Sequence, residues 1–147
     1  MVKKIKKIGL VLLMLFVGIQ FYRPNVNEQK ETTTDDFLIT EKAPDHIRSL
    51  LKTSCYNCHS SKTEYSWYDN IAPASWYVDD HIKNAKEKLN FSNWAILDER
   101  DRNGLISEIA VNLQEDKMPL PSYAMLHSEA KLSDAEKQQI IKWLASL

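Results

Sequence analysis

The feature that most constrains this chain is a run of five residues, Cys55-Tyr56-Asn57-Cys58-His59, which has the spacing C-x-x-C-H. Two thiols at this spacing reach the two vinyl groups at one edge of a porphyrin, and the histidine that follows lies under the iron. The motif therefore predicts one covalent haem c, with thioethers from Cys55 and Cys58 and with His59 as the proximal iron ligand.

Other uses of the two thiols fit the sequence less well. A thioredoxin-like C-x-x-C needs a strand–helix context, and no strand-rich stretch or βαβ pattern lies near Cys55. A zinc site needs further ligands at metal spacing, but the remaining histidines are scattered. The chain has only 2 cysteines, too few for a cluster held by four thiolates.

The second axial ligand of the iron is predicted to be Met118. It precedes Pro119 in a loop after an expected helix, and the proline restricts the backbone that presents the sulfur. Methionine ligation raises the reduction potential relative to two histidines. His127 and His81 are alternative ligands, and an open position or Met125 is also compatible with the sequence.

The N-terminus has the pattern of an export signal. Four lysines among the first seven residues precede an apolar run from Ile8 to Tyr22. This pattern keeps the lysines on the cytoplasmic side of a bacterial inner membrane and sends the chain that follows across it. We expect residues 1–23 to be a membrane anchor. In this arrangement residues 5–22 lie in the bilayer, and the haem domain lies in the periplasm. Cleavage of a signal peptide, which would release the domain into the periplasm, is the alternative. Residues 24–42 are expected to be a polar tether, and residues 43–147 the folded domain.

The charge of the chain argues against a nucleic-acid partner. From Pro24 onward there are 14 basic and 20 acidic residues, so no basic stripe is available to neutralise phosphates. The hydrophobic content of 44% and charged content of 27% are typical of a globular domain. We expect redox proteins of the periplasm or inner membrane as partners.

Periodicity predicts an all-α fold. A helix over residues 45–52 leads into the motif, and a second begins near Pro73 with Ser75 as N-cap. A third follows the apolar stripe from Leu105 to Leu113, where Gly104 weakens the prediction of one uninterrupted helix. Ser133 and Glu136 form a capping box before the last helix. The aromatic residues between the motif and the second helix are expected to fill the core: Tyr65, Trp67, Tyr68, Trp76 and Tyr77.

The order of these features resembles class I cytochromes c: a helix, C-x-x-C-H, a middle insertion, a Met-Pro loop and a terminal amphipathic helix that crosses the first. A closer resemblance is to the bacterial haem-binding domain family, and it covers roughly residues 43–146. It rests on the motif and on Trp67-Tyr68, Pro73-Ala74-Ser75-Trp76, His81, Leu89-Asn90-Phe91-Ser92, Trp94, Met118-Pro119, Tyr123 and Leu126-His127. The resemblance implies haem at Cys55, Cys58 and His59, with Met118 as distal ligand.

Electron transfer is the function that a haem with two axial ligands favours. A peroxidase-like enzyme and a haem-based sensor of gas or redox state are the alternatives, and both need a distal position that is open or easily vacated. No distal His–Arg pair of the peroxidase kind is recognisable, so an electron carrier is expected rather than a catalyst.

Overall fold

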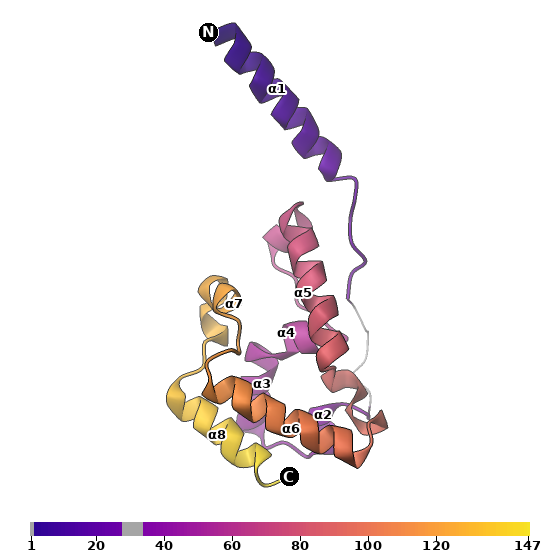
Figure 1. Cartoon of the computed structure of the whole chain (residues 1–147), viewed down its shortest axis with the longest axis vertical. Helices are drawn as coiled ribbons and strands as arrows, with labels where there is room; N and C mark the ends of the chain where they lie inside the picture. The colour runs from indigo at the N-terminus through magenta and orange to yellow at the C-terminus, as the bar shows by residue number, and fades with distance from the viewer. Residues whose placement is uncertain (1, 28–33) are drawn as a thin grey trace.

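The computed structural model describes residues 2–27 and 34–147, and these residues form helices with no β-strand among them (Figure 1). The all-α prediction is therefore confirmed for the described chain. In order, the elements are α1 (Val2–Ile19), α2 (Phe37–Thr40), α3 (Asp45–Ser54), α4 (Tyr56–His59), η1 (Trp67–Asn70), α5 (Ala74–Lys88), η2 (Phe91–Ile96), α6 (Glu99–Gln114), α7 (Pro121–Leu126), η3 (Ser128–Ala130) and α8 (Asp134–Leu144).

Helix α1 projects away from the other helices (Figure 1), and none of its residues is buried. It has 18 residues, four of which are lysines in its first two turns. Within residues 2–27 and 34–147, no helix has both the length and the apolar character needed to cross a membrane. The structure therefore gives no support to the anchor expected at residues 1–23.

The core of the domain is built around aromatic rings that the periodicity did not single out. Phe37 stacks on Phe91 with ring centroids 5.1 Å apart, and it meets the edge of Trp94 at 4.5 Å. The Trp94 side chain is fully buried, and its indole N–H donates to Glu41 Oε1 at 2.7 Å. This bond satisfies a donor that burial would otherwise leave without a partner.

The aromatic residues expected in the core lie outside it, so that prediction is wrong. None of the five is buried, and Trp67 is 77% exposed. They precede or begin α5, a helix that packs on α4 and η1. The segments that enclose the core are instead α2, α3, η2, α6 and α8.

The folded domain begins earlier than the boundary expected at residue 43. Asp36 caps α2 by accepting from the Leu38 N–H at 2.9 Å, and both Phe37 and Leu38 are fully buried. Two large apolar side chains at this depth belong to the core. The sequence did not predict the burial of Phe37 and Leu38, because most of their neighbours in residues 24–42 are hydrophilic.

The last helix forms as predicted. Ser133 and Glu136 make the capping box of α8, and Ile140 and Leu144, one turn apart, are buried. Helix α8 packs on both α6 and α3, as the resemblance implied for the terminal and first helices. Burial of Ile47 and Leu51 on α3 supplies the other side of this contact.

Two local expectations differ from the structure. Helix α6 runs without interruption from Glu99 to Gln114 through Gly104, and the Asp98 side chain caps it by accepting from Asp101 N–H. Helix α5 begins after Pro73, so Ser75 lies buried in its first turn and is not the N-cap. A proline at the cap supplies a preset φ without using a side-chain hydrogen bond.

Candidate haem site

The five motif residues form one tight turn between α3 and α5. Helix α3 ends at Ser54, and the Cys55 carbonyl accepts from the N–H groups of both Cys58 and His59, at 3.2 and 3.0 Å. Residues three and four positions apart lie on one face of a helical turn. The turn, called here the proximal turn, therefore presents Cys55, Cys58 and His59 together, as attachment of a single porphyrin requires.

The two variable residues of the motif hold the proximal turn in place. The Tyr56 phenol donates to Asp36 Oδ1 at 3.0 Å, and its ring stacks on Phe91 at 4.9 Å. Asn57 Nδ2 donates to the Tyr123 phenol oxygen on α7 at 2.8 Å. These contacts connect the turn to α2, η2 and α7, which sequence spacing gives no means of foreseeing.

His59 is oriented by a main-chain carbonyl. Its Nδ1 lies 3.0 Å from the Leu89 carbonyl oxygen, and because a carbonyl only accepts, Nδ1 carries the proton. The Nε2 lone pair is then the one available to a metal, and the bond fixes the orientation of the ring. Burial lowers the pKa of His59 and so favours the neutral imidazole that iron needs.

Two apolar cavities border the proximal turn. The first, the Met118 cavity, has a volume of about 140 Å³ and is lined by Cys55 and His59 together with Met118. The second, the His127 cavity, has a volume of about 260 Å³ and is lined by Cys58 together with the alternative ligands His81, Met125 and His127. The structure thus brings His59 and Met118 into one cavity, which none of the other candidate ligands lines.

His127 is already engaged at both ring nitrogens. Its Nδ1 donates to Glu129 Oε1 at 3.3 Å, which leaves Nε2 to accept from the Tyr68 phenol at 2.7 Å. Its ring also stacks on Tyr123 at 4.3 Å. Iron ligation by His127 would require loss of the Tyr68 bond.

His81 and Met125 have fewer contacts through their possible ligand atoms than His127 has. His81 Nδ1 donates to the Tyr77 carbonyl of its own helix at 2.8 Å, so in the neutral ring Nε2 is the nitrogen available to a metal. Met125 is 78% exposed on α7. His46 is exposed on α3.

Met118 lies in the loop between α6 and α7 and is half-buried. The main-chain N–H groups of Lys117 and Met118 both donate to the Asn112 carbonyl, at 3.0 and 3.3 Å. This bifurcated bond folds the loop back over the end of α6, whose residues Leu105, Ile109 and Leu113 line the Met118 cavity. Apolar side chains of α6 therefore line the same cavity as Met118.

The residues present fit a covalently held haem better than a redox-active thiol pair. Both cysteines are free of disulfides, and burial raises the pKa of Cys55 to about 12 and also raises that of Cys58. Disulfide exchange depends on a thiolate of low pKa, which this environment opposes. The Ser54 hydroxyl, which lines the Met118 cavity, is buried without a hydrogen-bond partner in the described structure, so the cavity holds a donor available to a bound group.

Binding of zinc would depend on how possible ligands are arranged among the described residues. Among the residues that the structure describes, no group of three or more His, Cys, Asp or Glu side chains could hold a metal ion. A structural zinc site uses about four such ligands. A porphyrin, in contrast, needs from the protein only one or two axial ligands.

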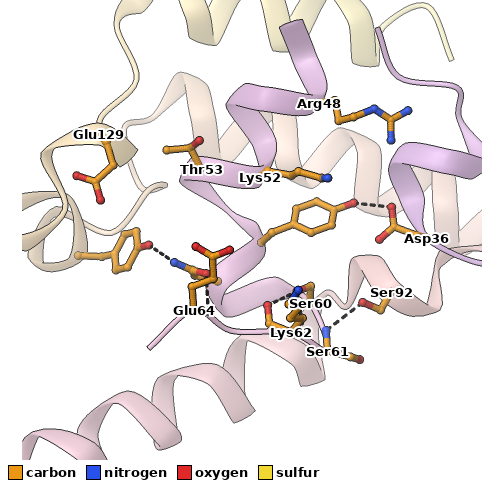
Figure 2. Close-up of a pocket in the computed structure, with 13 residues that line it drawn as sticks. Asp36, Arg48, Lys52, Thr53, Ser60, Ser61, Lys62, Glu64, Ser92 and Glu129 are labelled. Carbon is orange, nitrogen blue, oxygen red and sulfur yellow. Dashed lines mark hydrogen bonds between the residues drawn. The ribbon is translucent and has the colours of Figure 1, made fainter. Parts of the chain in front are cut away.

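A third and larger cavity, of about 450 Å³, lies on a polar side of the proximal turn (Figure 2). Figure 2 shows three basic side chains and three acidic ones around it, Arg48, Lys52 and Lys62 with Asp36, Glu64 and Glu129. The cavity includes Tyr56 and Asn57 in its lining but neither cysteine and not His59. It therefore lies apart from the face that attaches the cofactor.

Comparison with known proteins supports a haem-binding domain. The haem-binding domain family matches residues 14–146, and the chain belongs to that family. The chain is also similar to the cytochrome c peroxidase Ccp of Escherichia coli (strain K12), with 25% identity over 150 residues that cover 99% of this chain and 32% of the relative. It thus spans about a third of that relative's length. No solved structure matches the chain significantly.

Proposed function

We propose that this haem-binding domain is a monohaem c-type cytochrome that transfers electrons. Thioethers from Cys55 and Cys58 attach the haem, His59 Nε2 ligates the iron, and Met118 is the distal ligand. The single observation that carries the proposal is that Met118 and the oriented His59 ring line the same apolar cavity. The bound iron supplies the one-electron chemistry, and the protein supplies ligands, orientation and an apolar enclosure.

Met118 is favoured over the other ligands for reasons of geometry. His127 and His81 line the cavity of Cys58 instead of that of His59, and His127 Nε2 already accepts from Tyr68. A closed distal position leaves no site for a substrate on the iron, which is why this arrangement suits electron transfer. Redox proteins of the periplasm or inner membrane would be the partners.

Absorption spectra of the purified protein test the assignment. We expect the ferric protein to show the weak far-red band of sulfur–iron ligation, and the Met118→Ala variant to lose it and to bind carbon monoxide when reduced. Met125→Ala is the matched control, because it removes a methionine that does not line the cavity of His59 and should leave the band unchanged. If His127→Ala alters the spectrum and Met118→Ala does not, the distal assignment is wrong.

A peroxidase-like function is the second candidate, and the likeness to cytochrome c peroxidase Ccp is the observation that favours it. Under this alternative, or as a haem-based sensor, the protein would need a distal position that is open or easily vacated. Rapid binding of carbon monoxide by the unsubstituted ferrous protein, with reaction of the ferric protein toward peroxide, would favour these alternatives over electron transfer.

We further propose that residues 1–23 direct the domain to the periplasmic face of a bacterial inner membrane, with residues 5–22 in contact with lipid. The lysines before Ile8 and the exposed apolar side chains of α1 support this location. Cell fractionation with mass determination of the mature chain tests it. A product that floats with membranes at full length supports retention of the segment, and a soluble product that lacks it supports cleavage into the periplasm.

A further inference from the structure

The chain that follows α1 is bonded to the haem domain. Gln20 Nε2 donates to the Ala72 carbonyl at 3.1 Å, and Gln20 Oε1 accepts from the Ala72 N–H at 2.9 Å. The side-chain amide thus pairs with both polar groups of one residue's main chain. This Gln20 clasp joins the C-terminal end of α1 to the loop that begins α5, and Figure 1 shows the two ends near each other.

Two further contacts extend the attachment. The Trp76 indole N–H donates to the Tyr22 carbonyl at 3.0 Å, and the two rings meet edge to face at 5.8 Å. Asn27 Nδ2 donates to the Ser60 carbonyl, next to His59, at 2.9 Å, and Lys86 Nζ donates to Asn27 Oδ1 at 2.6 Å. The segment from Gln20 to Asn27 is therefore fixed to the domain at three places, and α1 has a defined point of departure.

An exposed aromatic surface surrounds this point of departure. Phe21 is 87% exposed and Trp67, on η1 beside α5, is 77% exposed, whereas the main core aromatics are fully buried. Neither cavity of the haem site includes these residues in its lining. We call this surface the aromatic end, and it consists of Phe21, Tyr22, Trp67, Ile71 and Trp76.

We propose that the aromatic end rests on the lipid bilayer that α1 contacts, so that the haem domain is held in one orientation at the membrane surface. This inference rests on the proposed membrane attachment of residues 1–23. Trp and Tyr rings favour the headgroup region, because one end of each ring is apolar and the other forms hydrogen bonds. Arg23, exposed beside Tyr22, is placed to meet lipid phosphates.

The continuity of the surface with α1 favours lipid over a protein partner. The side chains of α1 from Ile8 to Val17 are exposed around the whole helix, and a helix that is apolar on all sides is normally buried in a protein core or in lipid. The Gln20 clasp brings that helix directly to the aromatic end. A bilayer covers both regions at once.

Spin-label depth measurements on the haem-loaded full-length chain test the proposal. A nitroxide is attached to the Trp67→Cys variant and, as a matched control, to Ile96→Cys, which is 72% exposed on η2 beyond the opposite end of α5. The unsubstituted chain gives the labelling background from Cys55 and Cys58. Each protein is reconstituted with vesicles of phosphatidylethanolamine and phosphatidylglycerol and recovered by flotation.

We expect the label at position 67 to gain collisions with oxygen and lose collisions with an aqueous nickel complex when vesicles are present, and the label at 96 to stay aqueous. Adding Gln20→Ala should leave flotation intact and return the label at 67 to water.

If the chain floats while the label at 67 remains as aqueous as that at 96, the inference fails and membrane attachment stands. If the chain does not float, both fail. Protection of position 67 without vesicles that grows with protein concentration would assign the surface to a second copy and overturn the inference.

Discussion

The proximal turn and the Met118 loop, residues 115–120, hold the two proposed iron ligands in different ways. In the proximal turn, side chains of Tyr56, Asn57 and His59 each bond to a different segment of the domain. In the Met118 loop, main-chain bonds to the Asn112 carbonyl hold the backbone. An exposed ion pair between Asp116 and Lys137 adds to them, and exposed pairs contribute little to stability.

This difference separates attachment from ligation. In the proposed site, the proximal turn packs against the core through Tyr56, so it would fix the position of the haem. Met118, the proposed distal ligand, lies on a loop held by main-chain bonds, so its sulfur would leave the iron without disrupting the core. We therefore expect substitutions in the proximal turn to affect folding and haem retention, and substitutions in the Met118 loop to affect mainly the iron spectrum and the reduction potential.

The largest effect is expected from the double variant Cys55→Ser with Cys58→Ser. Without either thiol no thioether forms, so haem should be lost completely on acid–acetone extraction, while the unsubstituted protein keeps its colour. Met118→Ala should retain haem under the same treatment. Extraction of haem from the unsubstituted protein would contradict covalent attachment.

Removing the ring under the proximal turn should strongly destabilise the fold. Phe91 is buried and contacts Tyr56, Phe37 and His59, so Phe91→Ala should lower the free energy of unfolding by about 3–5 kcal/mol. Ile96→Ala, an exposed change on the same element, should stay within about 0.5 kcal/mol. Denaturant unfolding of both variants measures the difference, and equal stabilities would refute the packing argument.

The hydrogen bond between Asn57 and Tyr123 joins the proximal turn to the helix that follows the Met118 loop. Tyr123→Phe should cost about 0.5–1.5 kcal/mol of stability, the usual net contribution of one bond. A double-mutant cycle with Asn57→Ala should give a coupling energy of roughly 0.5 kcal/mol or more between the two changes. Strict additivity would show that the two regions are energetically independent.

The smallest effect is a change with pH at the capping residue of α2. Burial raises the pKa of Asp36, so the folded state binds its proton more tightly than the unfolded state does. The resulting stabilisation is fully present below the ordinary pKa of 3.8 and is lost as pH rises through the folded value. Unfolding curves should show the unsubstituted protein gaining stability relative to Asp36→Asn as pH falls into the acid range. A difference that does not change with pH would contradict this.

The parts of the fold that the sequence predicted are those encoded locally. The capping box at Ser133 and the helical spacing of Ile140 and Leu144 lie within one helix, so the sequence alone predicted α8. The same holds for α3, whose apolar positions precede Cys55. The placement of Phe37 and Leu38 could not be read, because two apolar residues in a polar stretch show no periodicity.

The candidate site also has features that the local sequence predicts and features that depend on contacts between distant segments. The spacing from Cys55 to His59 is sufficient to predict a haem, since the reacting groups are contiguous, and membership in the haem-binding domain family agrees. The carbonyl of Leu89 that orients His59 leaves no trace in the sequence, because every residue carries a carbonyl. The engagement of His127 by Tyr68, 59 residues away, depends on how α7 and η1 meet.

The sequence by itself determined the cofactor, the residues predicted to attach it and the helical class, because each depends on residues within about two turns of one another. Only the tertiary structure decided which candidate shares a cavity with His59, where the core begins and how the chain after α1 joins the domain. Those outcomes depend on contacts between segments distant in sequence, such as Gln20 with Ala72 and Tyr56 with Asp36. Such contacts form only when the core has brought the segments together.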